Sequence, residues 1–241
     1  LLIGLLVYTS VIKNIEQGLL SEKMRKLDYL KYRVERVLLE PSENLAIKYV
    51  MESMLDYTEL SFLSKNNYDK GIVKIWLLNR KLKEEIYSKA FIKSITSYFA
   101  VNDFVVSSHR FSKNSKDYED ADFINHINMN IDSLNGTWTT RRIKNEFDRD
   151  IELITYVKQF PYKFNNNFMQ GFIYVDLYKE ALSKLVYEIN FADMESVVIL
   201  NRDFDIVLSF NTNYSSYKDI INHYSNRIPE NFMIENISGQ M

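Results

Sequence analysis

A helical pattern followed by two hydrophobic strands around a short polar turn occurs twice in this sequence. SYFAVNDFVVSS (97–108) resembles SVVILNRDFDIVLS (196–209), since each has a hydrophobic strand, a turn with an Asp-Phe pair, a Val-rich strand and a final Ser. The paired Asp103 and Asp203 lie 203 − 103 = 100 positions apart. A supersecondary unit that recurs indicates tandem modules, although two unrelated hairpins could match by chance. The repeat therefore predicts an α+β chain with two similar modules of antiparallel sheet.

The first part of the chain is typical of a long helix that leaves a membrane. Residues 1–12 carry no charge and begin with a run that is apolar all round, whereas a surface helix shows one apolar stripe. The run is shorter than the roughly 20 residues that cross a bilayer, so it is either the end of a membrane helix that starts upstream or a buried core segment. From Ile12 on, apolar residues recur at helical spacing among charges of both signs. We therefore predict one helix from Ile15 to Leu38 that ends near Pro41, because the residue before a proline disfavours helical backbone.

The composition excludes several function classes. A net charge of -2 without a basic cluster argues against nucleic acid as a partner, because neutralising phosphates needs a basic surface. The absence of Cys excludes disulfides, thiolate catalysis and Cys-ligated metal. His109, His126 and His223 are scattered and match no hydrolase or metalloprotease motif. We therefore predict that the chain is not an enzyme and needs no cofactor.

The remaining elements follow from periodicity and turn residues. Asn102 and Asp103 tolerate positive φ and suit the turn of the first hairpin. The polar residues 109–136 predict a long loop with a short helix, and such loops are often functional. The other expected elements are a helix capped by Ser42 over 45–58, a turn at 66–69, a helix over 72–86, strands over 91–100, 104–108, 137–143, 151–160 and 168–175, a helix over 177–189 capped by Asp176, strands over 196–200 and 205–210, and a weak helix over 214–228.

The order of these parts resembles the extracytoplasmic double Cache (dCache) sensor region of bacterial transmembrane receptors. The resemblance rests on the stem LLIGLLVYTSVIKNIEQ, the hairpin AFIKSITSYFAVNDFVVSS, Trp138 with the Arg141-Arg142 pair, ELITYVKQFP, GFIYVDLYKEAL and SVVILNRDFDIVLS. It implies a long N-terminal stem helix and two tandem PAS-like modules. The implied division is the end of a transmembrane helix (1–12), the stem and the following helix (13–64), a membrane-distal module (65–176) and an incomplete membrane-proximal module (177–241).

The resemblance also implies a function. The stem and first hairpin are most similar to membrane-bound AraC-type transcriptional regulators, with sensor histidine kinases as an alternative output. The implied protein sits in the cell membrane through flanking helices, exposes this region outside the cytoplasm, dimerises through the stem and senses a small molecule. A membrane-tethered structural or protein-interaction module without a small ligand is the competing hypothesis.

A candidate ligand site follows from strand alternation. In the resembled family the distal module binds ligands between its sheet and the long loop, but this sequence lacks the Arg-x-Trp-Tyr run of the amino-acid-binding members. Trp138, Thr140 and Arg142 share one face of a predicted strand, as do Tyr156 and Lys158 on the next strand. An aromatic face with a guanidinium and a hydroxyl suits a carboxylate or a sugar. The candidate ligand-binding residues are Trp138, Arg141, Arg142, Tyr156 and Lys158, and the alternative makes Trp138 a core residue and Arg142 a surface residue.

Two acidic features have a structural interpretation that we favour. Asp176 could bind a ligand, but its place before a helical apolar pattern favours an N-cap. The run DYEDAD (117–122) lacks the Gly and the spaced Glu of a calcium loop, which favours a solvated acidic loop. No metal site is therefore predicted.

Overall fold

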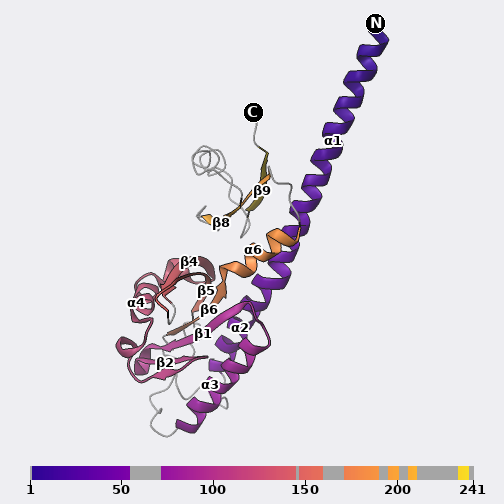
Figure 1. Ribbon diagram of the computed structural model, residues 1–241. Coiled ribbons are helices and arrows are strands. Elements are labelled where there is room, and N and C mark those ends of the chain that lie inside the picture. Colours follow the sequence, from indigo (N-terminus) through magenta and orange to yellow (C-terminus); the bar gives the residue numbers. More distant parts are fainter. Residues whose placement is uncertain are drawn as a thin grey trace. The chain divides into compact units, whose positions relative to one another are not determined.

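The computed structural model describes residues 2–54, 72–144, 147–159, 171–189, 195–200, 206–210 and 233–238 (Figure 1). The chain divides into two compact units, residues 38–181 and residues 1–37 with 182–241. The predicted turn at 66–69, the turn of the second hairpin and the weak helix over 214–228 lie outside the described residues. The module limits implied by the resemblance stay predictions.

The predicted stem helix is confirmed, but its predicted end is wrong. Helical structure runs through α1 (Leu2–Arg33), the π-helical η1 (Val34–Leu39) and α2 (Glu40–Met54), past Pro41. A proline inside an α-helix lacks an N–H and its ring collides with the carbonyl four residues earlier. The wider π turn directly before Pro41 accommodates this defect, as π-bulges do at kinks. Ser42 starts no new helix, since its hydroxyl donates to the Leu38 carbonyl at 2.7 Å.

Among the described residues, no helix combines the length and hydrophobicity that a bilayer span requires. The assignment of residues 1–12 to the end of a membrane helix stays a prediction.

The larger unit contains a six-stranded antiparallel sheet in the order β3-β2-β1-β6-β5-β4. β6 lies between β1 and β5, so the last strand in sequence occupies the middle of the sheet. This arrangement confirms the predicted α+β class. The strands are β1 (Ile92–Phe99), β2 (Phe104–Ser107), β3 (Phe111–Ser112), β4 (Thr137–Lys144), β5 (Asp150–Gln159) and β6 (Gly171–Tyr178).

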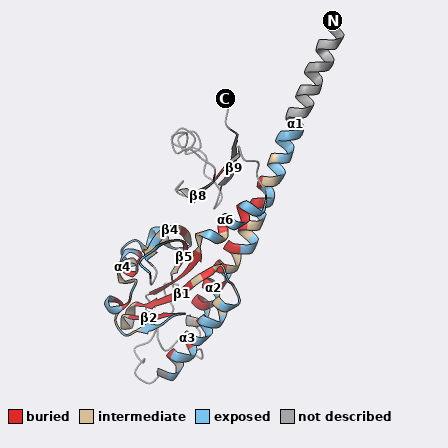
Figure 2. Cartoon of the chain, viewed as in Figure 1, coloured by how far each residue is buried: buried red, intermediate tan, exposed pale blue. Residues whose placement is uncertain are grey.

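Helices cover both faces of this sheet, and strand alternation divides its residues between them. α2 packs on β5 and β6, and α3 (Ile72–Tyr87) packs on β1 and β2. On the other face, Phe172, Tyr174 and Val157 form a core with Ile124 and Ile127 of α4 (Ala121–Met129). Buried residues therefore run along the central strands β1 and β6 without a solvent-facing side, whereas the edge strand β4 exposes Thr140, Arg142 and Lys144 (Figure 2). We call these the α2 face and the α4 face.

The connections are more ordered than the sequence predicted. The first hairpin turns through η3 (Ala100–Asn102) and Asp103, whose φ of 49° confirms the predicted left-handed position. Residues 109–136, predicted as a long loop with a short helix, contain β3, η4 (Ser115–Asp117), α4 and α5 (Ile131–Leu134). β3 extends the edge of the sheet, and the part with α4 lies over the sheet because Ile124 and Ile127 are buried there.

The smaller unit contains the second predicted hairpin. β7 (Glu195–Leu200) pairs with β8 (Ile206–Phe210) and, on its other side, with β9 (Met233–Ser238), all antiparallel. The β9 strand lies in a segment whose sequence pattern predicts neither a helix nor a strand. The helix predicted for 177–189 is α6 (Lys179–Glu188), and in this unit Glu188 accepts from Arg33 Nη2 at 3.2 Å.

Candidate functional site

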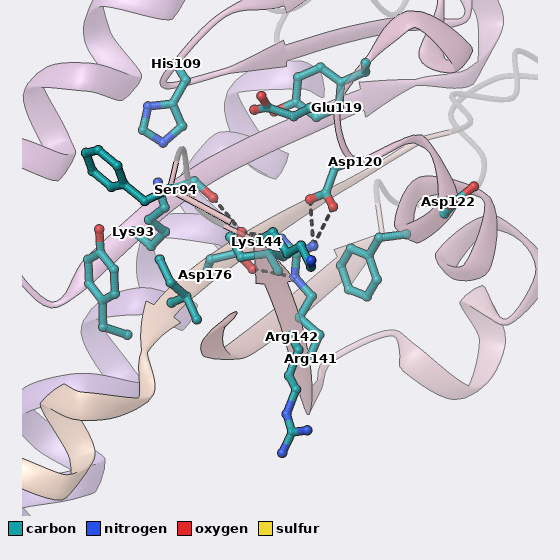
Figure 3. Close-up of a pocket in the computed structure, with 16 residues that line it drawn as sticks. Lys93, Ser94, His109, Glu119, Asp120, Asp122, Arg141, Arg142, Lys144 and Asp176 are labelled. Carbon is teal, nitrogen blue, oxygen red and sulfur yellow. Dashed lines mark hydrogen bonds and ion pairs between the residues drawn. The ribbon is translucent and has the colours of Figure 1, made fainter. Parts of the chain in front are cut away.

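A cavity of about 820 Å³ opens on the α4 face of the larger sheet. Its volume falls in the range of small-molecule sites, about 300–1,000 Å³. Residues of strands β1, β4, β5 and β6 form its floor, and the segment from Tyr118 to Phe123, with Glu119, Asp120 and Asp122 labelled in Figure 3, forms a wall. The lining residues are Lys93, Ser94, His109, Tyr118, Glu119, Asp120, Asp122, Phe123, Arg141, Arg142, Ile143, Lys144, Phe147, Ile151, Asp176 and Tyr178.

Asp176 lies at the floor, which overturns its predicted role as a helix N-cap. It is fully buried inside β6, directly opposite Ser94 on β1 and Thr155 on β5, and the helix starts only at Lys179. The hydroxyls of Ser94 and Thr155 both donate to its carboxylate, the latter at 2.6 Å. The strand pairing therefore extends past the position at which sequence rules place the cap.

Arg141 on β4 completes this buried cluster. Its Nε and Nη2 donate to the two oxygens of Asp176 at 3.1 and 2.6 Å, and its Nη1 donates to both oxygens of Asp120 at 2.7 and 2.6 Å. The guanidinium also lies 4.1 Å from the ring centroid of Phe123 and 5.3 Å from that of Tyr174. Burial lowers the pKa of Arg141, but the charges of Asp176 and Asp120, the neighbouring Tyr174 and the hydrogen bond to Asp176 together raise it by more, so the side chain stays protonated.

Tyr174 supplies a second donor to Asp120. Its hydroxyl lies 3.0 Å from Asp120 Oδ2, and burial raises its pKa well above the ordinary value, so it stays protonated. One guanidinium and two carboxylates leave the cluster with one net negative charge. The cavity floor is thus a preorganised set of charged groups that are paired with one another.

The structure separates the five predicted site residues. Arg141 and Arg142 line the cavity, although Arg142 is exposed and pairs with Glu152 at 2.7 Å. Trp138 and Tyr156 are register partners on the α2 face, with ring centroids 5.1 Å apart, so they are core residues. Lys158 lies beside Gly136, where β4 begins.

Several other cavity residues are not among the five predicted site residues. Asp120 and Phe123 belong to a segment that was predicted as mostly loop. For Asp176 the signal was present, because a carboxylate within the apolar run GFIYVDLY is unusual for a buried strand. Ser94 on β1 and Thr155 on β5 are the register partners of Asp176. No single segment of the sequence shows this proximity, because the three strands are far apart in the chain.

Among the described residues, no group of three or more His, Asp and Glu side chains is placed to hold a metal ion. In the acidic run 117–122, Asp120 is directed to Arg141.

Trp138 connects β4 to α2. Its indole Nε1 donates to Glu43 Oε1 at 2.8 Å. Replacing Trp138 by Phe keeps an aromatic ring against Tyr156 but removes this hydrogen bond, so we expect the free energy of unfolding to fall by about 1–2 kcal/mol. Urea unfolding followed by circular dichroism measures the change. Glu43→Gln, which keeps an acceptor, should cost less, and equal stability of Trp138→Phe and the unchanged chain would contradict this role.

No protein-family model matches the sequence. No curated protein matches it either. Solved structures do: the sensory domain of the Campylobacter jejuni chemoreceptor Tlp3 with isoleucine bound has a TM-score of 0.54 at 13% identity, covering 88% of this chain and 81% of that one. The chain has the fold of this sensory domain.

Two further structures share this fold. The Tlp3 ligand-binding domain in complex with L-valine aligns with a TM-score of 0.54 at 14% identity, over the same 88% and 81% of the two chains. An extracellular ligand binding receptor from Desulfohalobium retbaense aligns with a TM-score of 0.50 at 9% identity, over 83% of this chain and 34% of that one. The resemblance to Cache-type sensory domains inferred from the sequence is therefore confirmed at the level of the fold.

Proposed function

We propose that this chain is the extracytoplasmic small-ligand-sensing region of a bacterial membrane receptor. The observation that carries the proposal is the cavity of about 820 Å³ on the α4 face, whose floor holds a buried, fully paired charged cluster. Charged groups buried on a sheet are expensive, and they gather where a site needs them. The fold supports the same conclusion, because the similar structures of Campylobacter jejuni are sensory domains that contain isoleucine or L-valine.

We place the ligand over the cavity floor. Of the five predicted site residues, only Arg141 and Arg142 line this cavity, so these two are the proposed ligand contacts. Trp138 and Tyr156 do not contact the ligand in this proposal, because they are buried on the α2 face. β4 presents Arg141 to the cavity and, three residues earlier, Trp138 to α2, where it binds Glu43. A change at Arg141 therefore reaches α2 through one strand and one hydrogen bond.

In this proposal the stem helix transmits ligand binding to the cytoplasmic output domain. α2 continues the helical run of α1 and η1, and a ligand that binds two packings of this helix with different affinity shifts their populations. The stem serves as the dimer contact, and flanking helices hold the receptor in the cell membrane. On the sequence resemblance of the stem and first hairpin, the regulated output is a cytoplasmic AraC-type transcription regulator, with a histidine kinase as the alternative.

A thermal-shift screen of the 241-residue chain tests the sensing proposal. Amino acids, peptides, sugars and organic acids are tested as separate classes. A ligand at 100 times its dissociation constant adds about 2.7 kcal/mol to the free energy of unfolding, which raises the Tm by about 5–10 °C for a chain of this size. No rise in any class would favour the competing hypothesis of an interaction module without a small ligand.

A further inference from the structure

Asp120 fills a place in the cavity that is built for a carboxylate. Both of its oxygens accept from Arg141 Nη1, at 2.7 and 2.6 Å, and Oδ2 also accepts from the Tyr174 hydroxyl at 3.0 Å. Phe123 and Tyr174 pack against the guanidinium, and the Arg141 side chain is only 9% exposed. Two converging donors in an aromatic enclosure form an anion subsite, and a side chain of the same protein occupies it.

Asp120 is the partner of Arg141 that can leave. Its side chain is 21% exposed, whereas that of Asp176 is 1% exposed. Asp176 is also bound by Ser94 and Thr155 within the sheet. Removing Arg141 would leave Asp176 buried without its cation, which is strongly unfavourable, so a cationic ligand cannot readily take the place of the guanidinium. An anion that replaces Asp120 exchanges one carboxylate for another and leaves the charge of the cluster unchanged.

The Asp120 side chain also has an alternative hydrogen-bonding position, at the N-terminus of α4. It stands at the N-cap position of α4, the position at which an Asp side chain normally accepts from an amide of the first turn. Within the described first turn of α4, its carboxylate makes no such hydrogen bond, because it is directed to Arg141. A released Asp120 would cap α4, where the helix dipole also favours a negative charge. The residue therefore has two favourable positions, and the one seen here closes the subsite.

We propose that Asp120 is a built-in competitor for the ligand, and that the ligand carries a carboxylate which displaces Asp120 from Arg141 and Tyr174. This inference rests on the proposed sensing function and gives it a ligand class and a switch. Ligand binding and the capping of α4 become one event, since the same carboxylate cannot bind Arg141 and cap the helix. The Tyr174 hydroxyl remains a donor throughout, because burial keeps it protonated.

Acetate tests the subsite without knowledge of the natural ligand. In Asp120→Ala, Arg141 Nη1 and the Tyr174 hydroxyl lose their acceptor, so acetate should bind in the vacated place and raise the Tm saturably by about 2–4 °C. Acetamide, and sodium chloride at equal ionic strength, should not produce this rise. The unchanged chain should respond at least about tenfold more weakly, because its own carboxylate competes.

Asp122→Ala is the matched control, since Asp122 lines the same cavity two residues away and is exposed. It should respond to acetate as the unchanged chain does. Asp120→Asn keeps the shape of the side chain and provides a second test if Asp120→Ala does not fold; it should bind acetate more tightly than the unchanged chain. A saturable response of equal size in Asp120→Ala, Asp122→Ala and the unchanged chain would overturn the proposal, as would an equal response to acetamide.

The two proposals fail separately. If the screen finds a ligand that lacks a carboxylate and binds the unchanged chain and Asp120→Ala equally, the sensing function stands and the competitor role is wrong. If Asp120→Ala captures acetate but no compound class stabilises the unchanged chain, the subsite is real and the sensing function is wrong.

Discussion

Replacing Arg141 by Met is expected to lower the free energy of unfolding by about 3–5 kcal/mol, because it leaves two carboxylates close together without their cation. Asp176 carries most of this cost, since it is fully buried and cannot reach water. The hydrogen bonds from Ser94 and Thr155 remain, but neither neutralises the charge. Urea unfolding at neutral pH measures the loss.

Arg142→Met provides the matched control on the next residue. Arg142 is exposed and its ion-pair partner Glu152 is partly exposed, and such ion pairs contribute about 0–1 kcal/mol. Combining Arg141→Met with Asp176→Asn should restore part of the stability, because the second change removes the unpaired charge. Equal losses in Arg141→Met and Arg142→Met would contradict the central role of the buried cluster.

Replacing Phe172 by Ala is expected to cost about 3–5 kcal/mol. Phe172 is 1% exposed on the α4 face, and its ring centroid lies 5.2 Å from that of Tyr98 and 6.5 Å from that of Tyr174. Ile124 and Ile127 of α4 belong to the same core, so the cavity left by the ring lies beneath the helix that borders the ligand site. The loss should therefore weaken both the fold and the placement of Asp120.

Phe147→Ala is the control for this change, since Phe147 is 78% exposed. We expect it to alter the free energy of unfolding by no more than about 0.5 kcal/mol. Chemical denaturation gives both values, and a similar slope against denaturant in the two variants shows that the comparison concerns stability alone. A loss below 1 kcal/mol in Phe172→Ala would contradict the described core.

The sequence predicts the elements of this fold better than their ends. Both hairpins and the left-handed Asp103 follow from local patterns, since turn chemistry and strand alternation act over a few residues. The continuation of the helix past Pro41 does not, because sequence rules cannot anticipate that a π turn will absorb the proline. α4 was underestimated because its buried pair, Ile124 and Ile127, is too short a pattern to stand out in a polar segment.

The predicted site residues do not all meet at the cavity, and the reason is physical. Alternation groups Trp138 with Arg142 and separates both from Arg141, but it does not say which face carries the cavity, since helices bury both faces of this sheet. From local sequence, Asp176 can be either a helix N-cap or a strand residue. Only the pairing of β6 with Ser94 on β1 and Thr155 on β5 shows that it belongs to the strand. Arg141, one of the predicted candidates, does line the cavity, but its partners Asp120 and Asp176 lie in segments far from it in sequence.

Blocking the cavity tests the central claim, that a small ligand binds over the Arg141 cluster. Ile143→Trp places an indole on the cavity floor, whereas Thr140→Trp adds the same indole on the opposite side of the same strand. The measurement is the dissociation constant, by calorimetry, of the ligand that the screen identifies. We predict binding to Thr140→Trp within about threefold of the unchanged chain and a loss of at least about tenfold in Ile143→Trp. Undiminished binding to Ile143→Trp would contradict the proposed site.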